Sequence, residues 1–100
     1  MVINQNKTVR VNLPISLSWQ RINISSDRTF SAYIVEKKII DEAFAKKETL
    51  DLNTASIEIQ RDTNLFTQTL MGDGRYSLIL RNNNPEPINV KVEVTVSKSV

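Results

Sequence analysis

The sequence contains no cysteine and no histidine. Without cysteine, the chain has no disulfide framework, no zinc–thiolate site and no thiol nucleophile. Without histidine, catalysis by Ser-His-Asp or Cys-His groups is excluded, and so are metal sites built on imidazole. Carboxylates remain as the acid–base groups for catalysis, and we predict that the chain is not an enzyme and carries no cofactor or metal.

Glycine, proline and an excess of one charge are also scarce. The chain has two glycines and three prolines, and its 13 basic and 11 acidic residues are intermixed to give a net charge of +2. This composition argues against a low-complexity chain, and the lack of a basic stripe argues against nucleic-acid binding. The length of 100 residues indicates a single domain over residues 1–100.

Long apolar runs are missing as well. No stretch approaches the roughly 18–20 apolar residues that cross a bilayer, so we expect no direct membrane insertion. The first residues, from Met1 to Lys7, lack an apolar h-region, and no signal peptide is expected there. An extracytoplasmic or virion-surface location stays open if a leader or an upstream part is missing from this sequence.

The clearest pattern in the chain is a strict alternation of apolar and polar residues at Ile88–Ser97. The apolar positions are Ile88, Val90, Val92, Val94 and Val96, and polar residues separate them. A period of two over this length predicts a half-buried β-strand. Valine and threonine suit this role because their branched side chains pack well on a pleated surface.

Further strands are predicted along most of the chain. Alternation indicates strands at Lys7–Leu13, Ala55–Gln60, Leu65–Leu70 and Arg75–Arg81, polar turns at residues 25–28 and 61–64, and a glycine corner at Gly72–Gly74. Thr29–Glu36 is apolar on both faces, and we expect a central strand that is covered on both sides.

The apolar phase slips once within the first third of the chain. Ile15, Leu17 and Trp19 follow a period of two, but the next apolar residues are Ile22 and Ile24. Because a slip of one residue turns every later side chain to the other face, it predicts a bulge near Gln20–Arg21.

Residues 38–47 change to a helical period. Ile39, Ile40, Ala43 and Phe44 form an apolar stripe, which predicts one short helix. A helix of this length must dock on the sheet, because it is marginal alone. Taken together, the segments predict an all-β antiparallel two-sheet sandwich of about seven or eight strands with one short helix.

The order of these parts resembles a known group of β-sandwiches. A Y-I-V-E segment ending at Glu36 leads into the helix, and a G-x-Y-x-L-x-x-x-N run follows at Gly74, Tyr76, Leu78 and Asn82. Over about Thr29–Val96, the pattern is similar to GOLD-type (emp24-like) modules and to jelly-roll-like sandwiches. The family's cysteine pair, transmembrane helix and coiled coil are missing, so cargo sorting is not carried over. The resemblance implies a non-enzymatic interaction or structural module.

The carboxylates suit turns better than chemistry. Asp41 and Glu42 are neighbours on the predicted helix and do not face each other. Other aspartates lie in turn-like contexts, where aspartate bonds its own backbone; they are Asp27, Asp51, Asp62 and Asp73. An irregular calcium site at Asp51–Asn53 or Asp62–Asn64 is the weaker alternative, because no EF-hand loop is present.

Trp19 and Tyr33 are the candidate ligand-binding residues. The other aromatic side chains occupy positions that the pattern assigns to the core; they are Phe30, Phe44, Phe66 and Tyr76. An exposed Trp19 or Tyr33 could bind a sugar ring, although a tryptophan buried between two sheets is the commoner arrangement. The lysines at 37, 38, 46 and 47 could contact an anion, but a solvated helix rim is the favoured interpretation.

Function is predicted mainly by exclusion. We expect a non-enzymatic module that binds a protein partner or self-assembles, as an accessory domain or as a surface or virion component. Strands with free edges can pair with another chain, so Lys7–Leu13 or Ile88–Ser97 should lie at a sheet edge. The alternative is a carbohydrate-binding β-sandwich that uses Trp19 or Tyr33.

Overall fold

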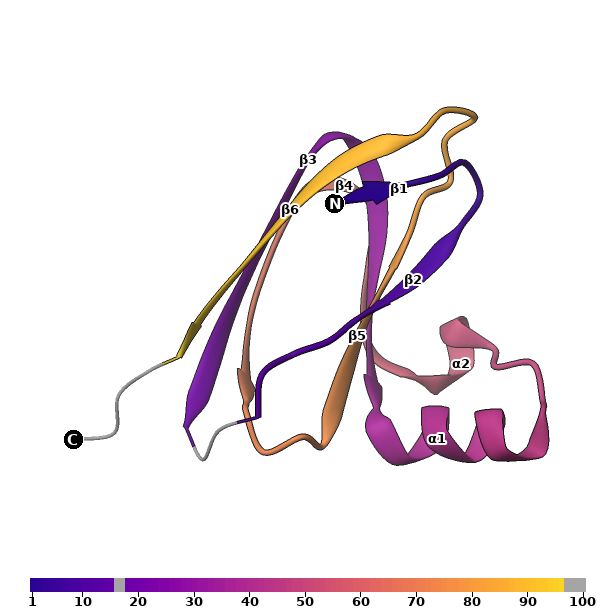
Figure 1. The fold of residues 1–100 in the computed structure, drawn as a ribbon, viewed down its shortest axis with the longest axis vertical. Helices are drawn as coiled ribbons and strands as arrows, with labels where there is room; N and C mark the ends of the chain where they lie inside the picture. The colour runs from indigo at the N-terminus through magenta and orange to yellow at the C-terminus, as the bar shows by residue number, and fades with distance from the viewer. Residues whose placement is uncertain (16–17, 97–100) are drawn as a thin grey trace.

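The computed structural model describes residues 1–15 and 18–96, and it shows a mainly β structure (Figure 1). Two helices, α1 (Lys37–Lys46) and α2 (Leu52–Ala55), lie between the third and fourth strands. The strands are β1 (Val2–Ile3), β2 (Thr8–Val11), β3 (Trp19–Glu36), β4 (Ser56–Met71), β5 (Tyr76–Arg81) and β6 (Ile88–Val96). Neither helix of the described ranges is long and apolar enough to cross a membrane.

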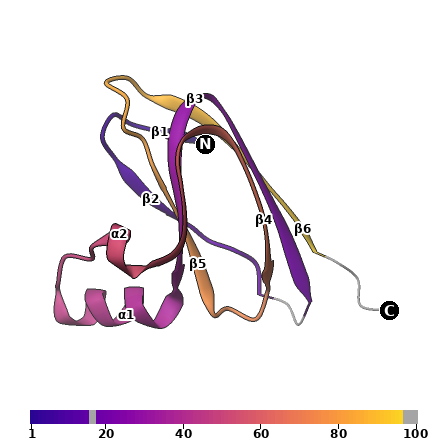
Figure 2. The same ribbon diagram turned by 180° about the vertical axis from the view of Figure 1, so that it is seen from behind.

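The described strands form one antiparallel sheet that curls over on itself. Its order is β1-β6-β3-β5-β2, and β4 pairs with β3. The first half of β3 pairs with β6 and the second half with β5, so the sheet has two arms. The first arm consists of β1, β6, the start of β3 and the end of β4. The second arm consists of the end of β3, the start of β4, β5 and β2. Figure 2 shows how β3 and β4 bend together to bring the arms face to face.

The structure confirms a mainly antiparallel β chain and a helix close to residues 38–47. Within the described ranges it shows six strands in one curled sheet and two helices, where seven or eight strands in two sheets and one helix were predicted. The predicted turns at residues 25–28 and 61–64 are wrong, because both segments lie inside long strands and bend them. The pairing register shifts between Ser25 and Phe30, and Asp62 takes a left-handed φ of 51°. Bulges and turns use the same small polar residues, so their patterns look alike in a sequence.

The predicted bulge near Gln20–Arg21 is also wrong. β3 pairs with β4 from Trp19 to Ser25 without a register shift. Gln20 takes the inward position before Ile22, and its side-chain amide donates to the main-chain oxygen of Pro14. The apolar pattern changes phase here because the side chain of Trp19 points outward, whereas those of Gln20, Ile22 and Ile24 point inward. Leu17 and Ser97, which also entered these predictions, lie outside the described residues.

Two apolar clusters stabilise the fold. The main cluster fills the space between the arms and includes Ile22, Phe30, Ile34 and Leu78. The second cluster lies between the outer face of the second arm and the helices, and its buried members are Tyr33, Val35, Ile40 and Ile79. The end of β3 is therefore covered on both faces, as predicted. Burying each large side chain contributes about 1.5–3 kcal/mol before the entropy of ordering is subtracted.

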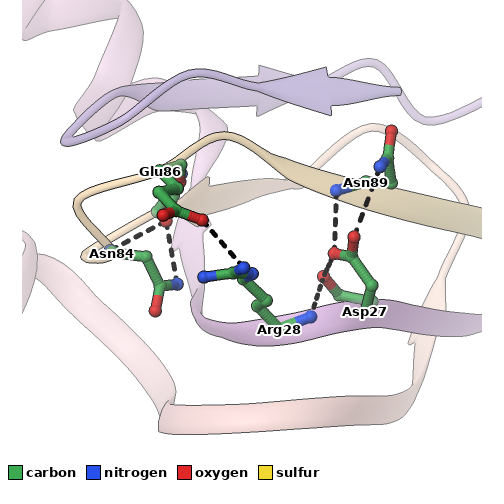
Figure 3. A network of polar contacts seen from close by, with 7 residues as sticks. Asp27, Arg28, Asn84, Glu86 and Asn89 are labelled. Atoms are coloured by element: carbon green, nitrogen blue, oxygen red, sulfur yellow. Dashed lines mark hydrogen bonds and ion pairs between the residues drawn. The ribbon is translucent and has the colours of Figure 1, made fainter.

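Polar contacts hold the corner of β3 against the loop between β5 and β6 (Figure 3). The carboxylate of Asp27 accepts from the backbone N–H of Asn89 at 3.0 Å and from its side-chain amide at 3.3 Å. Beside it, Arg28 and Glu86 form an ion pair at 2.8 Å. The hydrogen bonds from Asn89 hold the pKa of Asp27 below its ordinary value. This network fixes where the sheet turns over.

Candidate interaction surface

A long strand edge is open along β4. One side of β4 pairs with β3, and no strand of the described residues pairs with the other side. The second half of this strand, Thr63–Met71, reads T-N-L-F-T-Q-T-L-M and contains no charged residue, proline or glycine. Natural edge strands are commonly protected by lysine, proline or a bulge. Beyond the bulge at Asp62, this segment has none of these protections.

The hydrogen-bond pattern shows which backbone groups of β4 face the open edge. The N–H of Gly72 donates to the carbonyl of Ser18 at 2.9 Å, which makes this opposed pair a hydrogen-bonded one. Bonded and non-bonded pairs alternate in an antiparallel ladder, and the register continues unbroken to Leu65. The N–H and C=O groups of Thr67 and Thr69 therefore point away from β3.

Leu65 has the same orientation, and its backbone groups are already engaged. The hydroxyl of Thr63 accepts from the N–H of Leu65 at 3.2 Å and donates to its carbonyl at 2.7 Å. The side chain of Leu65 is 62% exposed on the outer face of the first arm. The open edge thus combines free backbone groups with an exposed apolar side chain.

On the core-facing side of β4, a side-chain hydrogen bond links the two halves of the strand. Glu58, which pairs with Ile34, lies on the core-facing side of the strand. Its carboxylate accepts from the side-chain amide of Gln68, in the other half of β4. An inward-pointing charge is a known protection for a sheet edge. Here the carboxylate belongs to the first half of β4 but lies against Gln68 on the inner face of the second half, whose own residues carry no charge.

The two candidate ligand-binding residues differ in their exposure to solvent. Trp19 is 53% exposed on the outer face of the first arm, directly opposite Met71 of β4. Tyr33 is only 6% exposed and packs in the cluster under the helices, so its prediction as a surface platform is wrong. The pattern placed Tyr33 on a doubly covered strand, which already pointed to burial.

The other predicted positions are structural or exposed. Phe44 was assigned to the core and is 71% exposed, because Ile40 makes the buried contact of α1. Asp51 caps α2, accepting from the N–H of Asn53 at 3.0 Å and from the hydroxyl of Thr54 at 2.9 Å. Across the described ranges, no group of three or more acidic side chains could hold a metal ion.

The expected positions of the sheet edges are partly correct. β2, predicted as part of Lys7–Leu13, is the last strand of the sheet. β6 pairs with β1 only at Ile88 and Asn89, so no described strand pairs with the outer side of Lys91–Val96. The open edge of β4 was not predicted. The sequence feature that could have indicated it is the run Thr63–Met71, which has no charged residue. The alternation of apolar residues predicts only an ordinary strand there, preceded by a turn.

Comparisons with family models, with curated proteins and with solved structures found no match for this chain. The resemblance to GOLD-type modules therefore stays a prediction. Function has to be inferred from the geometry of the surface.

Proposed function

We propose that this chain is a non-enzymatic protein-interaction module that pairs a β-strand with the open edge of β4. The strand belongs to a protein partner or to a second copy of the chain, which would make the module an assembly unit. The observation that carries the proposal is the uncharged edge Thr63–Met71 with outward-facing backbone groups at Thr67 and Thr69.

The energetics favour such pairing. Each backbone hydrogen bond made at the edge contributes about 0.5–1.5 kcal/mol net, and covering part of the exposed side chain of Leu65 adds apolar burial. No charged side chain of Thr63–Met71 has to be desolvated when a strand docks. The loss of translational and rotational freedom opposes these gains, so several bonded residues are needed for stable binding.

We also propose that the fold is a β-sandwich of the GOLD-like type. Two facing arms with a core between them support a sandwich-type module, and the run Gly74, Tyr76, Leu78, Asn82 supports the GOLD-like resemblance. An edge that pairs with another strand suits an accessory domain, a surface component or a virion component.

Light scattering across a concentration series tests the pairing, with Thr67→Lys as the variant. A lysine here places a charge beside the outward-facing backbone groups and blocks an incoming strand. Thr95→Lys is the matched control for the edge of β6, because Thr95 is exposed on β6, which β3 separates from β4. We expect the wild-type chain and the control to associate as concentration rises, and Thr67→Lys to stay monomeric.

Amide hydrogen exchange gives the second measurement. In the associated state, exchange at Thr67 and Thr69 should slow, because their N–H groups become bonded. Unchanged exchange at these amides in a defined oligomer would contradict the proposal. If the wild-type chain is a monomer at every concentration, pairing between two copies is excluded and pairing with a strand of another protein remains. Exchange at the amides of Thr67 and Thr69 then tests binding of that partner.

A second candidate function is carbohydrate binding through Trp19. The exposed indole lies on a strand face beside Arg21 and Asn23, and such a face offers a stacking surface with hydrogen-bonding groups next to it. Titration with glycans should change the tryptophan fluorescence, and an unresponsive spectrum counts against this function.

A further inference from the structure

A groove lies between α1 and the outer face of β2 and β5. Its volume is about 350 Å³, and its lining is more apolar than polar. Ile40, Phe44 and Leu50 line the helix side, and Arg10, Ile79 and Arg81 line the sheet side. Phe44 is the most prominent of these residues, because its aromatic side chain is 71% exposed and belongs to neither of the two apolar clusters.

The strand beside this groove has free backbone groups. Among the described strands, β2 pairs with β5 alone, on one side. The N–H of Asn82 donates to the carbonyl of Lys7 at 3.0 Å, and the register continues from there into β2. Since bonded and non-bonded pairs alternate, the backbone groups of Thr8 and Arg10 point to the open side. The side chains of these same two residues line the groove.

The groove is lined by two cationic side chains, Arg10 and Arg81, and by one acidic side chain, Glu48, so the net charge of its lining favours an anionic ligand. The guanidinium of Arg81 bonds Asn83 at 2.7 Å and the hydroxyl of Thr8 at 3.1 Å, and that of Arg10 bonds Asp41 at 3.5 Å and Ser77 at 3.0 Å. A guanidinium has five N–H donors, so both arginines keep donors free. Arg81 has no acidic partner among its described contacts and is the freer of the two.

We propose that this groove binds an extended acidic peptide of another protein. The peptide backbone pairs with Thr8 and Arg10 on the edge of β2. One peptide side chain, apolar in character, packs against Phe44. Side chains two residues apart share a face of a strand, so an Asp or Glu two positions away reaches Arg81.

This surface is distinct from the open edge of β4. β2 and β4 belong to opposite edges of the second arm, with β5 and β3 between them. The inference adds a second binding surface with its own ligand chemistry, and either surface can fail without the other.

Selection from a phage-displayed library of random peptides, with the whole chain as bait, tests the proposal. We expect enrichment of peptides with an apolar residue and an Asp or Glu two positions apart. The enriched peptide, made synthetically, should bind Phe44→Ala and Arg81→Gln about tenfold more weakly than the wild-type chain. The NMR amide signals of Thr8 and Arg10 should shift on binding. Thr67→Lys, which alters the β4 edge, should leave the affinity unchanged.

Several results would overturn this inference. They are the absence of enrichment, enrichment of basic peptides, and equal affinity for the wild-type chain, Phe44→Ala and Arg81→Gln. Loss of binding in Thr67→Lys alone also overturns it, and would instead place the peptide on the β4 edge. Because Phe44 is largely exposed and Arg81 lies at the surface end of β5, both variants should fold, which circular dichroism checks.

Discussion

The side-chain amide of Asn82 donates to the main-chain oxygen of Ile3 at 3.0 Å, joining residues 79 positions apart. The same amide donates to the carbonyls of Asn4 at 3.2 Å and Glu86 at 2.8 Å, and its oxygen accepts from the N–H of Asn84 at 2.8 Å. Asn82 is fully buried. One side chain therefore ties the N-terminal strand to the loop between β5 and β6.

Replacing Asn82 with alanine should lower the free energy of unfolding by about 2–4 kcal/mol, because several buried carbonyls lose their donor. Urea denaturation measures the change. Asn12→Ala is the control: Asn12 is exposed, and its loss should cost about 0.5 kcal/mol or less. Equal losses in the two variants would show that the buried amide is not the main link.

Asp27→Asn should make the stability of the chain less dependent on acid pH. Hydrogen bonds from Asn89 lower the pKa of Asp27 from its ordinary value of 3.8. A lowered folded-state pKa gives stability that is present above that ordinary value and is lost as the pH falls through the folded-state pKa. The difference in unfolding free energy between wild type and Asp27→Asn should therefore shrink below about pH 4.

Urea denaturation at a series of pH values measures this effect. Asn12→Ala again serves as the control, since it removes no titrating group and should differ from wild type by the same amount at every pH. A difference for Asp27→Asn that grows on acidification would contradict the assignment.

The bulge in β4 should accept glycine and reject a branched residue. Asp62 has a φ of 51°, in the left-handed region that costs most non-glycine residues about 1–2 kcal/mol. Asp62→Gly should match or exceed the wild-type melting temperature, whereas Asp62→Val should lose about 1–2 kcal/mol of stability. Gln60→Val is the control, because Gln60 is exposed and lacks a positive φ. Similar stability of Asp62→Val and Gln60→Val would argue against a strained bulge.

The tryptophan should behave as a solvent-exposed indole. Trp19 is the only tryptophan in the sequence, so the emission spectrum reports on this residue alone. With half of its surface exposed, we expect emission at long wavelength and efficient quenching by acrylamide. Unfolding should shift the emission only slightly. A short-wavelength maximum that resists quenching would place Trp19 in a core or an interface.

The sequence is most informative where the secondary structure of a residue depends on its neighbours along the chain. The alternation at Ile88–Val96 corresponds to β6, and the helical stripe around Ile40 corresponds to α1. The doubly apolar segment before Glu36 corresponds to a strand that is covered on both faces. These features follow local periods of two or 3.6 residues, which a sequence carries directly.

Tertiary contacts decide what the periods leave open. Whether polar residues such as Ser25–Arg28 reverse the chain or bend it depends on the partner strand, since β3 and β4 must curve together to enclose the core. The same holds for α2, a helix too short to show a period, and for β1, whose residues pair with β6 at the far end of the chain.

The sequence by itself determined β6, α1 and the doubly covered end of β3, and its lack of histidine and cysteine excludes chemistry that needs these residues. The tertiary structure decided which edges stay open, that Trp19 is outside and Tyr33 inside, and that Phe44 and Arg81 share a groove. The physical reason is that secondary structure follows from side-chain periodicity along the chain. Exposure and binding surfaces instead depend on which distant segments remain without a partner once the core has closed.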